Sequence, residues 1–366
     1  MTRSRTTRLL LALTLVAALC SLFFGSTADA LPDHRGPARA TSTSRVVKKR
    51  PVRRRSRRVV RRHRTPARPA PGRPASSATG HRNPALWPFA TASPWNVPIG
   101  TAAQFGGTDD ARDVAIADPG LGGTVNAAAW SQPVYQATTS DGVRHIDWDG
   151  QSIAIHVPAG AQISVGEDRN LHIIDPTGTF VDEMYNARMS GSTIQVDNYV
   201  RYDLRGAGFG QGGVRASGAS AVGGLIRTWE LQWGTIKHAL AFAIPASSQR
   251  SGWVWPAQSQ DSWAQGIYGG AIPMGSLFAI PRSVNLDSLG LSREGLVIAK
   301  ALQQYGAYDV DSSDGFVLYA EPSSEGLLDG ARNDIPKLRS LLQVVANSGP
   351  FAVGGGGSPT APLAPG

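Results

Sequence analysis

Residues 169–188, with the sequence RNLHIIDPTGTFVDEMYNAR, contain two short apolar runs on either side of the turn residues Asp-Pro-Thr-Gly at 175–178. Apolar and polar side chains alternate in both runs, which is typical of β-strands with one buried face. The stretch therefore predicts a β-hairpin over 169–187. The candidate strands of the region are 134–137, 153–157, 171–175, 180–187, 193–204, 224–231 and 236–244. Because no helix-length pattern separates them, we expect a mainly β fold, an antiparallel β-sandwich of the jelly-roll or concanavalin-like kind.

The spacing of apolar residues becomes helical towards the C-terminus. Residues 292–305 begin with a serine that can cap a helix and are followed by a glycine, so they predict a helix. A second helix is predicted over 334–346, with a proline in its first turn. Between the two, apolar runs at 307–310 and 316–320 predict a hairpin. The sandwich is thus expected to carry two C-terminal helices.

Composition divides the chain into four parts. Residues 1–30 combine three arginines, an apolar run and the small residues Ala-Asp-Ala, which predicts a secretory signal peptide. Residues 31–82 are rich in Arg and Pro and are expected to be a disordered basic linker. Residues 83–353 are expected to be one globular domain, and 354–366, rich in Gly and Pro, a flexible tail. The single cysteine lies inside the signal, so the domain must fold without an internal disulfide.

The formal net charge of +9 belongs to the linker, which has 17 Lys and Arg against one acid. Removing the 20 basic and two acidic residues of 1–82 from the totals of 36 and 27 leaves 16 basic and 25 acidic residues, a net of −9 for the rest. The linker predicts attraction to anionic cell-envelope polymers. It lacks interleaved aromatic residues, so specific nucleic-acid binding is not expected. We expect a secreted protein, held near the cell wall by the linker and without a transmembrane anchor after signal cleavage.

The region 169–245 holds most of the groups that could do chemistry. Glu183 with Glu230 or Asp175 could form the paired carboxylates of a glycoside hydrolase. Alternatively, Tyr185 and His238 could be the acid and base of a polysaccharide lyase, with arginines neutralising a uronate. The predicted catalytic residues are Glu183, Tyr185, Glu230 and His238, and the predicted substrate-binding residues are Arg169, His172, Asp175, Arg215 and Arg227. This interpretation requires Arg169, Glu183, Glu230 and His238 to lie together on the solvent side of one sheet.

A non-catalytic reading of the same residues stays open. Each carboxylate could pair with an arginine as a structural bridge, since charge pairs also occupy sheet faces without function. The protein would then be a cell-wall-associated carbohydrate-binding or structural module. Its ligand surface, or simply its core, would be formed by Trp229, Trp233, Trp253, Trp255 and Trp263. The sequence does not decide between an enzyme and a module that binds polysaccharide.

No cofactor and no metal are predicted. Residues 309–315 resemble a calcium loop, but the glycine falls one position late and no glutamate follows at the required place, so a polar hairpin turn is expected. The glycine-rich stretch 206–213 lacks the Lys-Ser/Thr of a phosphate-binding loop and is expected to be a flexible loop beside a cleft. Ser217 and Ser220 do not lie in a nucleophile elbow.

Several short motifs occur together between 87 and 319. They are WPF at 87–89, SPWN at 93–96, DR at 168–169, HIID at 172–175, EMY at 183–185, GLIR at 224–227, KHAL at 237–240, PMG at 273–275 and ALQQYG at 301–306. As a set they resemble a family of secreted, β-rich actinobacterial proteins with no settled activity. The resemblance implies a secreted β-rich domain. Similar proteins often have an aspartate before the GLIR strand, where this chain has RASG at 215–218, which puts any role of that aspartate in doubt here.

Overall fold

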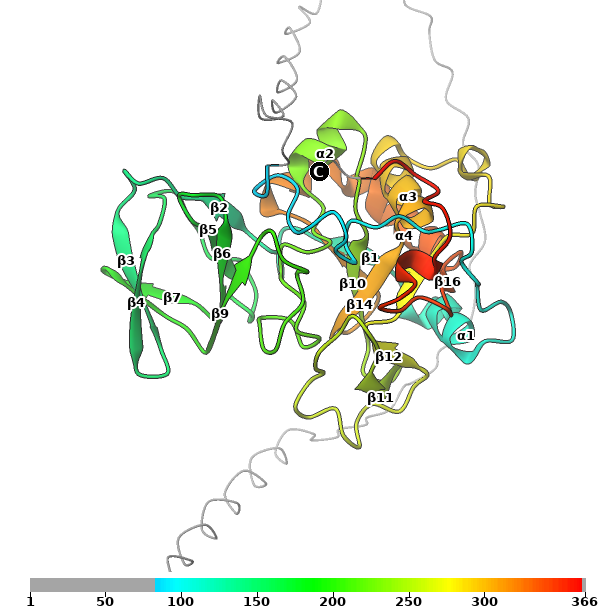
Figure 1. Ribbon diagram of the computed structural model, residues 1–366, viewed down its shortest axis with the longest axis horizontal. Coiled ribbons are helices and arrows are strands. Elements are labelled where there is room, and N and C mark those ends of the chain that lie inside the picture. The colour runs from blue at the N-terminus through cyan, green and yellow to red at the C-terminus, as the bar shows by residue number, and fades with distance from the viewer. Residues whose placement is uncertain (1–82, 364–366) are drawn as a thin grey trace, which may run out of the picture. The chain divides into compact units, whose positions relative to one another are not determined.

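The computed structural model describes residues 83–363. The predicted signal peptide (1–30) and basic linker (31–82) lie outside the described residues. The described part of the chain is mainly β, with strands in mixed sheets and a few helices, of which the longest are C-terminal (Figure 1). Within residues 83–363, no helix is long and apolar enough to cross a membrane.

A six-stranded sheet forms the centre of the domain. Its strand order is β1 (Thr124–Asn126), β15 (Val317–Tyr319), β10 (Leu240–Ile244), β14 (Ala307–Ser312), β13 (Leu277–Ala279) and β16 (Gln343–Val344). The pairs β1/β15 and β10/β14 are parallel, and the other pairs are antiparallel. The register of β10 against β14 shifts by one residue between Phe242 and Ala243. The prediction of a 307–310/316–320 hairpin is wrong, because β10 lies between β14 and β15.

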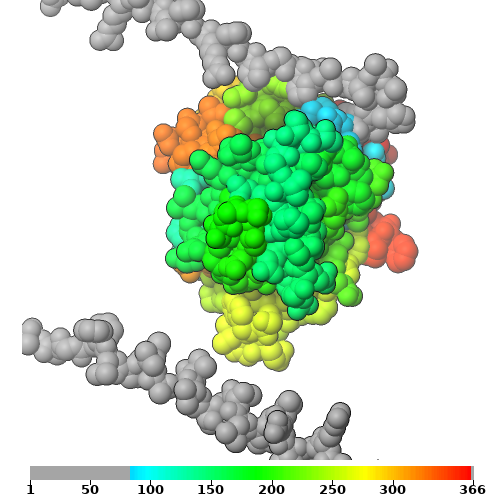
Figure 2. Space-filling view, turned by 90° about the vertical axis from the view of Figure 1, so that its left-hand side faces the viewer, coloured from blue at the N-terminus to red at the C-terminus, as the bar shows by residue number. Residues whose placement is uncertain are grey.

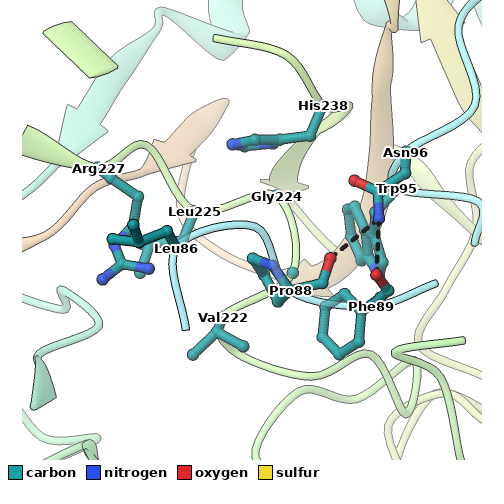
Figure 3. Close-up of a pocket in the computed structure, with 11 residues that line it drawn as sticks. Leu86, Pro88, Phe89, Trp95, Asn96, Val222, Gly224, Leu225, Arg227 and His238 are labelled. Atoms are coloured by element: carbon teal, nitrogen blue, oxygen red, sulfur yellow. Dashed lines mark hydrogen bonds between the residues drawn. The ribbon is translucent and has the colours of Figure 1, made fainter. Parts of the chain in front are cut away.

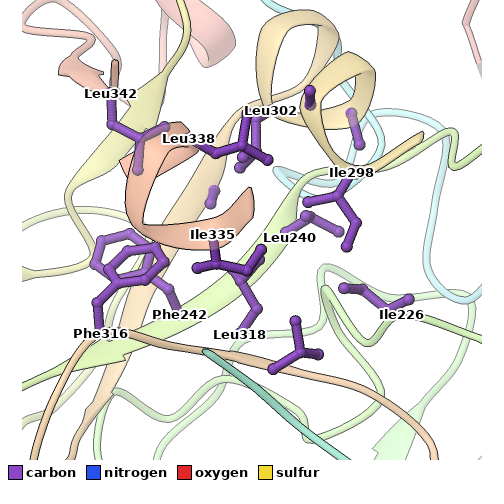
Figure 4. Close-up of a cluster of buried hydrophobic side chains, with 14 of the residues drawn as sticks. Ile226, Leu240, Phe242, Ile298, Leu302, Phe316, Leu318, Ile335, Leu338 and Leu342 are labelled. Atoms are coloured by element: carbon purple, nitrogen blue, oxygen red, sulfur yellow. The ribbon is translucent and has the colours of Figure 1, made fainter. Parts of the chain in front are cut away.

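Helices α3 (Arg293–Gln304) and α4 (Asp329–Arg339) cover one face of this sheet (Figure 4). The face is apolar because every second residue of β10, Leu240, Phe242 and Ile244, points to the helices. The intervening alanines pack on the opposite face. Burial of each large side chain contributes about 1.5–3 kcal/mol, so this core stabilises the sheet–helix layer. The sequence correctly predicts α3, including its N-cap. The second helix was predicted over 334–346, but α4 begins five residues earlier and ends seven residues earlier, and β16 lies within the predicted range.

Two four-stranded sheets lie side by side, at the left of Figure 1. One has the order β2 (Val134–Gln136), β5 (Leu171–Ile174), β6 (Phe180–Tyr185), β9 (Asn198–Asp203). The other has the order β4 (Gln151–His156), β3 (Val143–Trp148), β8 (Thr193–Gln195), β7 (Arg188–Ser190). A shared apolar cluster includes Ile146 and Ile194 from the second sheet and Leu171 and Met184 from the first. The β5/β6 hairpin confirms the prediction made from 169–187.

The antiparallel β-sandwich is not confirmed. Parallel pairs occur in both four-stranded sheets, at β2/β5 and β3/β8, so the sheets are mixed and open. The predicted strand 224–231 is also wrong, because Thr228–Trp233 form the short helix α2. Strand partners depend on contacts between distant segments, and the local alternation from which we predicted strands carries no information about them.

The remaining elements surround the sheets. Strands β11 (Gln249–Trp253) and β12 (Ile272–Met274) form a small parallel pair in a separate lobe, at the bottom of Figure 1. Helix α1 (Ala111–Ala117) lies near β16. The short 3-10 helices are η1 (Pro119–Leu121), η2 (Leu286–Leu289), η3 (Pro322–Leu327) and η4 (Val353–Gly355).

Segments at both ends of the described chain pack on the domain. Phe89 and Trp95 are buried, as expected for packing aromatics, and the Trp95 carbonyl accepts a 2.7 Å hydrogen bond from the Ala239 amide. The stretch that we expected to be a flexible tail is held by backbone hydrogen bonds. The Ser358 carbonyl accepts from Thr101 N at 2.9 Å, and Thr360 N donates to the Ile99 carbonyl at 3.0 Å. The tail therefore completes the domain edge as far as the described residues extend.

Candidate functional site

A cleft of about 640 Å³ opens where the β14–β15 connection faces the loop that precedes β5. Its lining residues are Leu121, Gly123, Thr124, Asn126, Trp130, Glu167, Asp168, Ser312, Ser313, Asp314, Gly315, Phe316, Val317 and Tyr319. The loop is fixed opposite β1 by a backbone hydrogen bond of 2.7 Å from Trp130 N to the Val165 carbonyl. Binding sites for small molecules commonly have volumes in this range.

One wall of the cleft combines an aromatic ring with a carboxylate. Trp130 is 45% exposed, and its indole Nε1 donates a 2.8 Å hydrogen bond to Glu167 Oε2. The carboxylate holds the indole by its only polar atom, so the ring orientation is restrained while much of the ring stays open to solvent. An aromatic face of this kind can pack against the apolar face of a sugar ring.

Three aspartates meet beside the cleft. Asp311, at the end of β14, is partly exposed; burial, followed by the negative charges of Asp261 and Asp168, raises its pKa to about 8. Burial and the neighbouring Glu167 also raise the pKa of Asp168. Asp261 accepts a hydrogen bond from the Tyr268 hydroxyl. Asp311 is therefore a carboxylic acid that keeps its proton at neutral pH.

Tyr319 and Arg215 form the floor next to these acids. The Arg215 guanidinium lies 4.9 Å from the centroid of the Tyr319 ring. It donates to the carbonyls of Ser220, Ala221 and Gly223 at 2.7–3.1 Å. Arg215 is 2% exposed, and its burial lowers the pKa of the guanidinium. The Arg215 guanidinium therefore binds the loop carbonyls and is shielded from solvent. This position does not support the predicted role of Arg215 in direct substrate binding.

The arrangement has the parts needed for acid–base chemistry. A carboxylic acid that is protonated at neutral pH can donate a proton, and a second carboxylate nearby can activate water or stabilise positive charge. Asp311 and Asp168 match these two roles. Among residues 83–363, no three His, Cys, Asp or Glu side chains are grouped so as to hold a metal ion.

Of the predicted catalytic residues, Tyr185 lies nearest to these acids. It is the last residue of β6, is partly exposed, and has a pKa raised first by burial and then by Asp168 and Asp311. Arg169 follows Asp168 and is exposed, and its backbone adopts a positive φ of 45°. Both residues border the site, but the described contacts give neither a direct bond to Asp311.

Glu183 and His172 lie in the interior, as a cross-strand pair on β6 and β5. Glu183 is 0% exposed and accepts hydrogen bonds from Ser220 Oγ, Ala221 N at 2.9 Å and Val222 N at 3.4 Å. Burial outweighs these bonds and raises the Glu183 pKa to about 7. Burial lowers the His172 pKa to about 3, and His172 Nε2 lies 2.6 Å from the Gln132 side-chain oxygen. Glu183 joins β6 to the 220–222 loop, and His172 joins β5 to Gln132. Both side chains are enclosed, so a polysaccharide cannot reach them.

Glu230 and His238 contact each other in a different place, where His238 lines a small cavity (Figure 3). Glu230 lies on α2, where it accepts from Arg227 N at 3.0 Å, and His238 Nε2 is 3.1 Å from its carboxylate. The cavity volume is about 10 Å³, enough for about one water molecule. Figure 3 shows Pro88 and Phe89 below the His238 ring. A sugar cannot enter.

The predicted grouping of Arg169, Glu183, Glu230 and His238 on the solvent side of one sheet is therefore wrong. Glu183 is enclosed in a strand, whereas Glu230 belongs to a helix. Arg227 forms a 2.5 Å ion pair with Glu321, which is the structural bridge that the sequence allowed.

Asp175 is likewise a turn residue. Its carboxylate accepts from Thr179 N at 2.9 Å and Phe180 N at 3.0 Å. These bonds close the β5/β6 turn, at the opposite end of β6 from Tyr185.

Sequence reasoning missed the residues that the cleft brings together. Asp168 was noted only as part of a motif, and Asp311 was assigned to a polar hairpin turn. The signal available was the acid near the end of an apolar strand, because charged residues are rarely buried and tend to mark where a strand leaves the core. Comparisons of the chain with protein-family models, curated proteins and solved structures found no match.

Proposed function

We propose that the protein is a glycoside hydrolase that acts on an extracellular polysaccharide in the Asp168/Asp311 cleft. The observation that carries the proposal is an open cleft of about 640 Å³ lined by Asp168 and the exposed Trp130, with Asp311 directly before the lining residue Ser312. The raised pKa of Asp311, about 8, supports its role as the acid. Hydrolysis of glycosidic bonds uses such a pair of carboxyl groups, one protonated and one ionised.

In this mechanism Asp311 transfers its proton to the glycosidic oxygen as the bond from that oxygen to the anomeric carbon breaks. Asp168 then either takes a proton from the water that attacks the anomeric carbon or attacks that carbon itself. In the second case water, deprotonated by Asp311, later releases the sugar, so Asp311 regains its proton and Asp168 is again a carboxylate. In the first case Asp168 ends protonated and Asp311 ionised, and exchange of protons with solvent restores both before the next turnover. Both routes consume one water.

The charge of the cleft favours a hydrolase over the lyase that the sequence also allowed. Lyases of this kind act on uronates, whose carboxylates would be repelled by Glu167, Asp168 and Asp314. Two buried cations beside the cleft, Arg215 and Arg339, donate to backbone carbonyls. A neutral or amine-bearing polysaccharide is therefore the proposed substrate.

A non-catalytic carbohydrate-binding or structural module is the second candidate. Its supporting observation is that Glu183, Glu230 and His238 are held in hydrogen bonds within the interior. In either case we propose export through residues 1–30 and attraction of the basic linker 31–82 to anionic envelope polymers, as the sequence predicts.

The test is incubation of the protein with neutral, amine-bearing and uronate polysaccharides, followed by assay for reducing ends and for the absorbance of unsaturated uronates. We expect new reducing ends from a neutral or amine-bearing polymer and their loss in Asp311→Asn. Unsaturated uronates would establish the lyase instead. Saturable binding to a polysaccharide without any cleavage would establish the module.

A further inference from the structure

A second surface of the domain has the features of a sugar-binding site. In the lobe that contains β11 and β12, Trp253, Val254, Trp263 and Ile267 form an aromatic patch in which the side chains are 37–59% exposed. We propose that this aromatic patch binds sugar rings of an uncharged polysaccharide and extends the Asp168/Asp311 cleft. The proposal rests on the proposed function, because it concerns the same substrate chain.

The aromatic patch contains the most exposed tryptophans of this region. Of the five tryptophans between 229 and 263, Trp253 and Trp263 are 50% and 48% exposed, whereas the other three are partly buried. Figure 2 shows this part of the chain, in yellow, as a lobe that protrudes at the bottom of the view. Large apolar side chains gathered on a protruding surface are typical of a binding site.

The residues of the aromatic patch are held in place rather than carried by free loops. Gly252 N donates to the Gln260 side-chain oxygen at 2.7 Å, and Ser251 Oγ donates to the Ala264 carbonyl at 3.2 Å. These bonds join the segment that carries Trp253 to the segment that carries Trp263. The Trp263 ring also packs edge-on against Tyr268, with the ring centroids 5.4 Å apart. A rigid aromatic platform loses little entropy when a sugar ring packs on it.

The composition of the lobe indicates an uncharged ligand. From 251 to 270 the only charged residue is Asp261, and three glutamines, Gln258, Gln260 and Gln265, stand among the aromatics. Glutamine amides can donate to and accept from sugar hydroxyls. A surface for anionic lipids would instead carry several lysines or arginines. Aromatic faces with amides beside them therefore favour neutral sugars.

Two connections link the aromatic patch to the cleft. Tyr268, under Trp263, donates from its hydroxyl to Asp261, whose charge raises the pKa of Asp311. Ser259 Oγ donates to the Ala216 carbonyl at 2.7 Å, next to the buried Arg215 that lies over Tyr319. These contacts join the lobe to the segments beside the cleft, and the proposal places successive sugars of one polysaccharide chain on the two surfaces.

The test measures polysaccharide binding by the full chain carrying Asp311→Asn, so that no turnover occurs. Affinity electrophoresis with xylan, mannan, β-glucan and glycol chitosan, and with polygalacturonate as the charged probe, identifies the polymer that is retained. In this background Trp253→Ala and Trp263→Ala are each expected to weaken binding about 3- to 10-fold, the loss of one aromatic contact. Phe351→Ala, at a fully exposed phenylalanine outside the lobe, is the matched control.

The outcomes separate this proposal from the proposed function. If Asp311→Asn abolishes hydrolysis but both tryptophan variants bind like their parent, the aromatic patch is not a sugar site although the cleft is catalytic. If the tryptophan variants lose binding while Asp311→Asn keeps full hydrolysis, the aromatic patch stands and the catalytic assignment fails. Retention of polygalacturonate alone, or of no polymer, would overturn the aromatic patch as a site for uncharged sugars.

Discussion

Two places in the domain bring a carboxylate together with another ionisable side chain, but only one of them is open. Around His238 the cavity holds about 10 Å³, whereas the cleft beside Asp168 holds about 640 Å³. At the closed cavity, the Glu230 carboxylate accepts from the Arg227 amide and also contacts the His238 imidazole. At the open cleft, Asp311 is partly exposed and lies near other acids. The comparison teaches that residue type alone does not identify a site, since the same groups also serve as structural links.

The largest expected effect is on activity, through the protonation of Asp311 beside the cleft. Because Asp311 donates only when protonated, kcat/KM is expected to fall tenfold per pH unit above about 8. Asp311→Asn should lower kcat by about 10²–10⁴-fold and abolish this alkaline decline. The measurement is the pH profile of reducing-end release. Asp109→Asn, at an exposed acid outside the cleft, is the control; an alkaline decline that persists in Asp311→Asn would contradict the assignment.

Removal of the buried carboxylate on β6 should affect folding instead. Glu183→Ala leaves Ser220 Oγ, Ala221 N and Val222 N without their acceptor in the interior. We expect the free energy of unfolding to fall by about 3 kcal/mol, as measured by urea denaturation. Glu167→Ala, at an exposed carboxylate, should change it by less than about 0.5 kcal/mol. An equal change in the two variants would mean that the Glu183 contacts add no net stability.

The pH dependence of stability is a second test of Glu183. The folded protein keeps a proton on Glu183 up to about pH 7, whereas the unfolded chain loses it near 4.5. The stability that this proton gives is therefore fully present below pH 4.5 and lost as the pH rises through 7. The stability difference between the parent and Glu183→Gln should fall by up to about 3 kcal/mol over this range.

His172 has the opposite effect. Its lowered pKa, about 3, means that the unfolded chain binds a proton below pH 6.5 that the folded protein excludes. Stability is therefore lost as the pH falls from 6.5 towards 3, and the two effects oppose each other between 4.5 and 6.5. Comparison of Glu183→Gln with its parent isolates the glutamate. A stability difference that is constant with pH would show that Glu183 ionises normally.

The smallest expected effect concerns the closed cavity. His238→Ala removes one partner of Glu230, which keeps its bond from Arg227 N. We expect a loss of about 1–2 kcal/mol in the free energy of unfolding and an unchanged kcat. The measurements are urea denaturation and steady-state kinetics. A tenfold fall in kcat with parental stability would make the two places equivalent and return His238 to a catalytic role.

Local sequence patterns predicted those parts of the fold that depend on neighbouring residues. The alternation at 237–244 gave the two faces of β10, and the serine before Arg293 gave the start of α3. The partners of β14 and β15 could not be predicted in this way. They are set by β10, which comes from a distant part of the chain and lies between them.

The candidate site was harder to predict for the same reason. Tyr185 was predicted to be catalytic together with Glu183 or His238, and its catalytic role stays a prediction, although its pKa shows that it lies near Asp168 and Asp311. Glu183, two residues earlier on the same strand, was selected on the same pattern but is enclosed by the 220–222 loop. Whether a polar residue on a strand faces solvent or a covering loop depends on the tertiary structure.

The register shift in β10/β14 makes the chemistry of the cleft depend on the number of residues in a strand. Phe242 pairs with Asp309 and Ala243 pairs with Asp311, so Val310 is an additional residue in β14. Asp309 is enclosed and contacts the Gln249 amide, while Asp311 reaches partial exposure. Deletion of Val310 would make the two acids consecutive, and consecutive residues of a regular strand point to opposite faces of the sheet. A three-nucleotide deletion would therefore redirect an acid without replacing it, a change that no point substitution makes.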